Sequence, residues 1–128
     1  MKTVVYADKF YLTSGVTGPG YLDISNGVFG EMTKEKPTGE IEIIDYTGKW
    51  IAPGLVDTHI HGFKNNDVMD NNAEGIKQMS EDLLSCGVTS FLPTTLTSSR
   101  EQLTAVAKTI GEVYKDVKGA KIQGIYFE

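Results

Sequence analysis

Residues 53–62 read Pro53-Gly54-Leu55-Val56-Asp57-Thr58-His59-Ile60-His61-Gly62. This segment predicts a short apolar strand, and the only two histidines of the chain come at its end. Side chains two residues apart on a strand project to the same side, so His59 and His61 can present two imidazoles to one point. Neutral imidazole is the commonest metal ligand and suits Zn²⁺. The segment therefore indicates a metal site, against the alternative that two histidines merely lie close together in a strand.

Several polar residues near this segment have two interpretations each. Asp57 can orient a histidine ligand through a hydrogen bond, or it can be an ordinary carboxylate at a strand end. Thr94 and Thr95 end the next predicted strand, where they can face the site or cap the following loop. Lys64 can approach a substrate phosphate or remain a solvated loop residue.

The rest of the chain after residue 53 alternates between strand and helix patterns. A helix is expected with Asn71 as its N-cap, followed by a strand at 88–92, a helix that starts near Ser99, and a strand at 121–127. Apolar residues recur at helical spacing in both helices, at Ile76, Met79 and Leu83 in the first and at Leu103, Val106, Ala107, Ile110, Val113 and Tyr114 in the second. Gly87 can end the first helix.

This order of elements implies parallel strands joined by right-handed crossovers, and the spacing is that of a (β/α)₈ TIM barrel. Only three barrel strands and two helices are present, whereas a closed barrel takes roughly 250 residues. We therefore expect residues 51–128 to be the first βαβαβ part of an α/β barrel, truncated after Glu128.

The first fifty residues are expected to form a different unit. Residues 3–7, 21–24 and 40–45 have strand patterns, and Ser25-Asn26-Gly27 is a turn signal from which 28–32 can return as a hairpin arm. Residues 1–50 are thus predicted as a small antiparallel β-sandwich portion before the barrel.

Composition limits the class of protein. The chain has 128 residues, of which 40% are hydrophobic and 23% charged, with a net charge of -5. An acidic, globular composition argues against nucleic-acid and anionic-membrane partners. The chain has no apolar run of membrane-spanning length and no signal-peptide pattern, and its single cysteine, Cys86, is interpreted as a core residue. Together these features favour a cytoplasmic protein.

Trp50 is expected to pack where the two units meet.

Glu128 is a further candidate ligand. It follows the apolar strand at 121–127, so it would lie at the carboxyl end of the third barrel strand, on the rim that holds His59 and His61. A carboxylate can complete part of a metal shell. The alternative is a solvated chain end.

Residues 53–62 resemble the opening signature of the amidohydrolase superfamily. Residues 66–70, 87–94 and 122–128 are similar to one family within it, the N-acetylglucosamine-6-phosphate deacetylases. The resemblance implies that His59, His61 and Glu128 are metal ligands. The metal would be divalent, expected to be zinc, with iron, manganese or cobalt as alternatives.

The same resemblance implies an activity: removal of the acetyl group from N-acetylglucosamine 6-phosphate, an amino-sugar phosphate, by a homo-oligomer such as a dimer. The family's catalytic and sugar-phosphate-binding residues lie on later strands and match no position here. We therefore expect the 128-residue chain alone to be inactive.

Two other functions stay open. A dihydroorotase-like or cyclic-amide hydrolase is one, but in dihydroorotase-like enzymes an arginine usually follows the paired histidines closely. Here Gly62-Phe63 follows, and the only arginine is Arg100, on a predicted helix. The other alternative is a non-catalytic metal-binding module.

Overall fold

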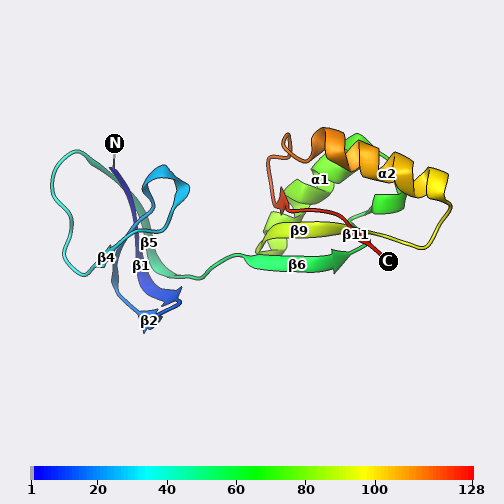
Figure 1. Cartoon of the computed structure of the whole chain (residues 1–128). Coiled ribbons are helices and arrows are strands. Elements are labelled where there is room, and N and C mark those ends of the chain that lie inside the picture. Colours follow the sequence, from blue (N-terminus) through cyan, green and yellow to red (C-terminus); the bar gives the residue numbers. More distant parts are fainter. Residues whose placement is uncertain (1) are drawn as a thin grey trace. The chain divides into compact units, whose positions relative to one another are not determined.

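The computed structural model describes residues 2–128 (Figure 1). The chain divides into two compact units, Met1–Pro53 and Gly54–Glu128. The division lies within the segment that links the last strand of the first unit to the strand that carries His59. Among the described residues, no helix is long and apolar enough to cross a membrane.

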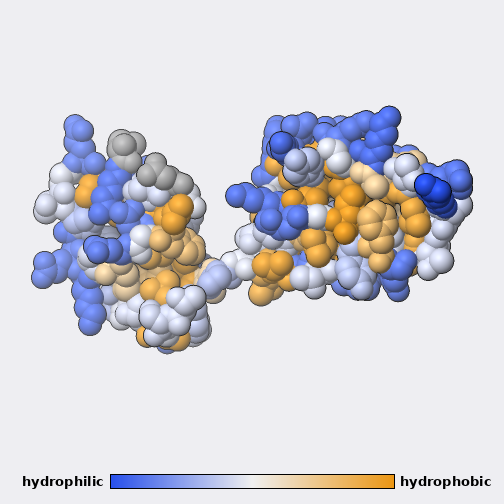
Figure 2. All heavy atoms as spheres, viewed as in Figure 1, coloured by the Kyte–Doolittle hydropathy of each residue, from blue (hydrophilic) through white to orange (hydrophobic). Residues whose placement is uncertain are grey.

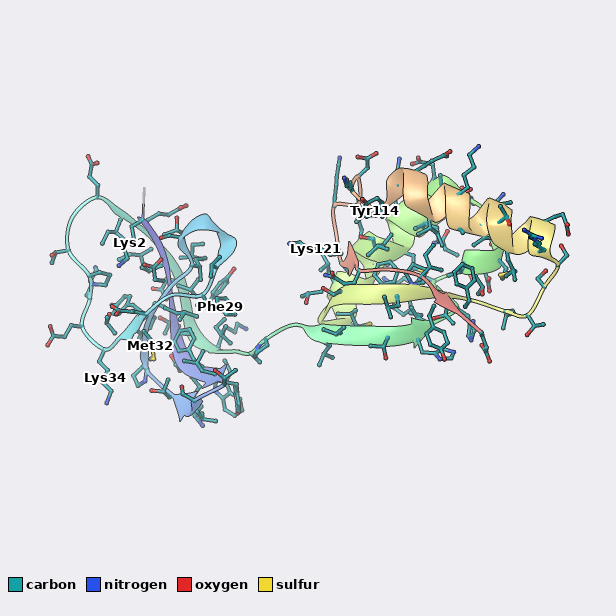
Figure 3. All side chains as sticks on the ribbon, viewed as in Figure 1. Lys2, Phe29, Met32, Lys34, Tyr114 and Lys121 are labelled. Carbon is teal, nitrogen blue, oxygen red and sulfur yellow. The ribbon has the colours of Figure 1, made fainter. Side chains whose placement is uncertain are left out.

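The first unit contains one five-stranded sheet built around its first strand. Its strands are β1 (Lys2–Leu12), β2 (Gly15–Thr17), β3 (Gly20–Asp23), β4 (Met32–Thr33) and β5 (Ile41–Ile51). Strands β2 and β3 run antiparallel to β1, and β4 runs antiparallel to β3. Val5, Ala7 and Phe10 of β1 are buried with Leu22, and Met32 packs against this cluster (Figure 3).

The expectation of an antiparallel unit is wrong for one strand pair. Strand β5 runs parallel to β1, with Val4 opposite Ile43. The long connection after β4 returns the chain to the end of the sheet at which β1 starts, so β5 follows the same direction as β1. The predicted turn at 25–27 forms the short 3-10 helix η1 (Ser25–Gly27). Of the hairpin arm predicted at 28–32, only Met32 lies in a strand, the two-residue β4.

The second unit is a parallel sheet with helices on one face (Figure 1). Strands β6 (Leu55–Ile60), β10 (Lys121–Ile122) and β11 (Tyr126–Phe127) each pair in parallel with β9 (Val88–Thr95). The predicted parallel order is confirmed, although the expected third strand is interrupted between β10 and β11. Strand β9 lies in the middle of the sheet, and its Phe91 is fully buried.

Helices α1 (Ala73–Leu83) and α2 (Arg100–Val113) bury most of the predicted apolar faces, but Tyr114 follows α2 and is exposed rather than part of its buried face. Fully or almost fully buried positions include Ile76, Met79 and Leu83 in α1 and Val106, Ile110 and Val113 in α2. Ser99 caps α2 as predicted, because its hydroxyl accepts a hydrogen bond from the N–H of Gln102 at 3.2 Å. Gly87, at φ +77°, ends the 3-10 turn η3 (Leu84–Cys86) that continues α1.

The predicted cap of α1 is wrong by one residue. Asn72 caps the helix by accepting from the N–H of Glu74 at 3.1 Å. Asn71 instead has left-handed φ of +53° and ends the 3-10 helix η2 (Val68–Asp70). Its side-chain oxygen accepts a hydrogen bond from the Thr109 hydroxyl in α2 at 2.6 Å. Asn71 therefore ties the start of one helix to the other, a contact that no local pattern reveals.

One further expectation is also corrected. Cys86 is exposed rather than part of the core, because the turn of η3 places it away from the buried side of α1. Within the first unit, Lys9 Nζ lies 4.4 Å from the ring centroid of Trp50; the packing of Trp50 where the two units meet stays a prediction.

Exposed apolar side chains remain on both units (Figure 2). In the second unit they include Leu55 and Val56 of β6, and Tyr126 and Phe127 of β11. These two strands flank β9, so the exposed apolar residues follow the two sides of the sheet.

Candidate metal centre

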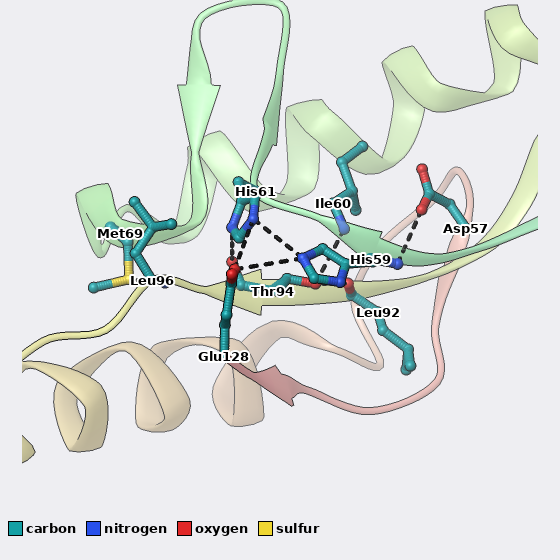
Figure 4. Close-up of polar contacts among 9 residues, drawn as sticks. All are labelled: Asp57, His59, Ile60, His61, Met69, Leu92, Thr94, Leu96 and Glu128. Atoms are coloured by element: carbon teal, nitrogen blue, oxygen red, sulfur yellow. Dashed lines mark hydrogen bonds and ion pairs between the residues drawn. The ribbon is translucent and has the colours of Figure 1, made fainter.

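Three side chains meet at the carboxyl ends of the parallel strands (Figure 4). His59 lies near the end of β6, His61 directly follows β6, and Glu128 directly follows β11. The two imidazole Nε2 atoms are 3.2 Å apart. Glu128 Oε2 lies 3.4 Å from Nε2 of His59 and 3.0 Å from Nε2 of His61. Parallel strands end at one edge of a sheet, so residues far apart in the sequence come together there.

The triangle formed by these atoms has the dimensions of a metal site. Zinc binds imidazole nitrogen and carboxylate oxygen at about 2.0–2.2 Å, so tetrahedral ligand atoms lie about 3.3 Å apart. The three observed separations, from 3.0 to 3.4 Å, agree with this spacing. The side chains of His59, His61 and Glu128 are 48%, 34% and 49% exposed, so water can reach a fourth position. The donor set of two imidazoles and one carboxylate suits a divalent ion.

The orientation of His61 is fixed by the neighbouring strand. Its Nδ1 lies 3.2 Å from the main-chain oxygen of Thr94 in β9. A carbonyl oxygen can only accept a hydrogen bond, so Nδ1 carries the proton. In neutral imidazole the other nitrogen, Nε2, then presents its lone pair to the cluster. This arrangement is the common one for metal-binding histidines.

His59 is held by contacts with an aromatic side chain and with its own strand. Its ring centroid is 5.0 Å from that of Tyr126 in β11 and 5.0 Å from that of His61. Asp57 accepts a hydrogen bond at 3.1 Å from the main-chain N–H of His59. The contact of Asp57 is therefore with the main chain of this histidine rather than with an imidazole.

Three other polar residues were candidates for the site: Thr94, Thr95 and Lys64. Thr94 is buried beside the cluster, and Thr95 is buried with a hydroxyl that has no hydrogen-bond partner among the described residues. Lys64 forms an ion pair with Asp82 of α1 at 3.2 Å. It lies in the turn between strands β7 (Gly62–Phe63) and β8 (Asn66–Asp67), a hairpin that the sequence patterns did not predict.

Comparison with known proteins gives one family and several relatives. A match to the amidohydrolase family spans residues 50–127. The chain is 37% identical over 79 residues to an N-acetylglucosamine-6-phosphate deacetylase of Vibrio furnissii, covering 61% of this chain and 20% of that protein. It is 29% identical over 129 residues to an N-acetylgalactosamine-6-phosphate deacetylase of Escherichia coli O157:H7, covering 100% of this chain and 33% of that protein.

A solved structure has the same fold. The N-acetylglucosamine-6-phosphate deacetylase from Pasteurella multocida superposes with a TM-score of 0.87 at 21% identity, covering 99% of this chain and 34% of that one. The chain thus spans between 20% and 34% of the length of the three proteins compared.

Proposed function

Since the chain belongs to the amidohydrolase family, we propose that it is the first part of a metal-dependent enzyme that deacetylates N-acetylglucosamine 6-phosphate. The observation that carries this proposal is the convergence of His59, His61 and Glu128 at ligand distances from one another. The family is metal-dependent, and relatives with this named activity match both units of the chain.

The fold supports assigning each unit to one part of the proposed complete enzyme. In this proposal β6, β9 and the interrupted pair β10 and β11 are the first three strands of a (β/α)₈ barrel, with α1 and α2 as its first two helices. Residues 1–50 would be part of a β-sandwich, to which the mixed sheet of the first unit would contribute one layer. The likeness to the Pasteurella multocida fold across nearly the whole chain supports this assignment.

The residues of the chain would prepare the site for amide hydrolysis. His59 and His61 offer neutral nitrogen lone pairs, and Glu128 offers one negative charge, so the site leaves a divalent ion with net positive charge. Such an ion, when bound, lowers the pKa of water and polarises an amide carbonyl. Hydrolysis breaks the C–N bond of the acetamide and adds water across it, giving acetate and glucosamine 6-phosphate. The base that carries the proton to the leaving amine is expected on later strands.

Zinc is the proposed metal, with iron, manganese or cobalt as alternatives, because its preferred ligands and bond lengths fit the triangle. A homo-oligomeric state, such as a dimer, and a cytoplasmic location stay predictions. The absence of catalytic activity in the 128-residue chain alone is also a prediction. Acetate release by the purified chain, with either N-acetylglucosamine 6-phosphate or N-acetylgalactosamine 6-phosphate as substrate, would contradict it.

Metal binding by the chain tests the proposal directly. We expect Zn²⁺ titration against a chromophoric chelator to show one bound ion. His61→Ala and Glu128→Gln should each weaken binding by more than about 100-fold, because loss of outer hydrogen-bond partners alone costs about 10- to 100-fold. Lys64→Ala serves as the control, since Lys64 pairs with Asp82. Equal affinity in all four proteins would refute the assignment of the ligands.

A further inference from the structure

The pairing of β6 with β9 is irregular where the ligands begin. Asp57 pairs with Phe91 and Ile60 pairs with Pro93, so three steps along β6 match two steps along β9. One extra residue in a strand is a bulge, and bulges re-aim side chains next to functional sites. Pro93 has no N–H, so β9 cannot donate a main-chain hydrogen bond at this position. The register of the ladder is therefore interrupted in the segment that carries the two histidines.

Thr94 adds side-chain contacts across this irregularity. Its hydroxyl accepts a hydrogen bond from the N–H of Ile60 at 3.0 Å and donates one to the carbonyl oxygen of Leu92 at 3.0 Å. Ile60 lies between the two histidines in sequence. The carbonyl oxygen of Thr94 also accepts from Nδ1 of His61 at 3.2 Å (Figure 4). One fully buried residue thus contacts both the main chain between the ligands and the second imidazole.

We propose that Thr94 is a positioning residue of the metal centre, an inference that rests on the proposed function. Its hydroxyl fixes the main chain at the bulge, so that His59 and His61 approach one point despite the irregular pairing. Its carbonyl oxygen holds His61 in the tautomer whose Nε2 lone pair faces the cluster. A valine at this position would keep the shape of the side chain and the carbonyl, but it would remove the hydroxyl to which the Ile60 N–H donates.

Thr95 provides a matched control one residue later in the same strand. Both threonines are fully buried. The Thr95 hydroxyl has no hydrogen-bond partner within the part of the chain that the structure describes. Thr95→Val therefore makes the same chemical change at the same burial without removing a bond. The pair of variants separates the role of the Thr94 hydroxyl from a general effect of removing a buried hydroxyl.

The experiment measures Zn²⁺ affinity and the visible spectrum of bound Co²⁺ in the wild-type chain, Thr94→Val, Thr94→Ser and Thr95→Val. We expect Thr94→Val to bind Zn²⁺ about 10- to 100-fold more weakly, as outer-shell losses do, and to change the Co²⁺ spectrum. Thr94→Ser keeps the hydroxyl and should restore both properties. Thr95→Val should match the wild type. Far-UV circular dichroism of the metal-free proteins shows that each variant is folded.

The outcomes separate the two proposals. Absence of Zn²⁺ binding by the wild-type chain overturns the proposed metal centre and this inference with it. Wild-type affinity and spectrum in Thr94→Val overturn only the inference. Nitrogen NMR of the imidazoles in the metal-free wild-type chain is a second test that needs no variant. It should show a proton on Nδ1 of His61, as donation to the Thr94 carbonyl requires, and an Nδ1 without a proton would overturn the role of that carbonyl.

Discussion

Gly119 shows how a single residue sets the spacing between a helix and a strand connection. A Cβ atom at Gly119 would collide with the main-chain carbonyl of Ser80 in α1. The N–H of Gly119 donates to the Ser80 hydroxyl at 3.2 Å, and that hydroxyl donates to the carbonyl oxygen of Ala120 at 2.8 Å. The missing side chain allows this close approach. The approach places the chain at the start of β10, which leads to Glu128.

Substitution of this glycine should be costly. We expect Gly119→Ala to lower the free energy of unfolding by about 1–3 kcal/mol, the usual effect of overpacking. Gly111→Ala is the contrasting variant, because Gly111 lies within α2 with open space around it. It should stabilise the chain by about 0.5–1 kcal/mol through helix propensity. Urea unfolding followed at 222 nm measures both, and a stabilising Gly119→Ala would contradict the packing described here.

At the scale of secondary-structure elements, Asp23 joins β3 to its neighbours. Its carboxylate accepts a hydrogen bond from the Ser25 N–H at 2.8 Å and forms an ion pair with Lys2 of β1 at 3.1 Å. Hydrogen bonds from the Ser25 side chain and main chain, and then from Lys2, lower the pKa of Asp23 to about 2, from 3.8. The charged carboxylate is therefore favoured in the folded state.

This pKa predicts how the stability of the first unit depends on pH. A folded-state pKa below the unfolded value gives stability that is complete above about pH 4 and is lost as the pH falls toward about 2. We expect Asp23→Asn to lower the urea midpoint of Trp50 fluorescence at neutral pH, and the difference from wild type to shrink toward pH 2. Glu35→Gln, which changes an exposed charge in the same unit, is the control. A difference independent of pH would contradict this role of the carboxylate.

At the scale of the whole molecule, the candidate ligands connect distant parts of the sheet in the second unit. His59 and His61 come from the end of β6, and Glu128 follows β11, with β9 between these strands. A bound ion would therefore link β6 to β11, the strands on either side of β9. Binding only to the folded state stabilises it by mass action.

Metal addition should accordingly raise the stability of the helices. Both α1 and α2 lie in the second unit, so the signal at 222 nm reports on it. Zn²⁺ at a hundred times its dissociation constant should add about 2.7 kcal/mol to the free energy of unfolding. Removal of the metal with a chelator should reverse the gain, and His61→Ala should gain less than about 0.4 kcal/mol at the same Zn²⁺ concentration. Identical midpoints with Zn²⁺ and with chelator in the wild type would rule out a stabilising site.

Local patterns in the sequence determined much of this molecule. The period of two along a strand placed His59 and His61 on one side, and helical spacing identified the buried faces of α1 and α2. The alternation of strands and helices indicated parallel strands, whose carboxyl ends bring Glu128 to the histidines. These features follow from the geometry of the chain over a few residues, which is why they could be predicted.

Only the tertiary structure decided how separate segments pair. The parallel match of β5 with β1, the contact of Asn71 with Thr109, and the bulge in β6 opposite Pro93 each depend on residues distant in the sequence. Thr94 is the clearest example, because its contacts with Ile60 and His61 exist only when β9 lies beside β6. The sequence thus determined which residues could bind a metal. Strand pairing decided how they are held, because contacts between distant segments have no period along the chain.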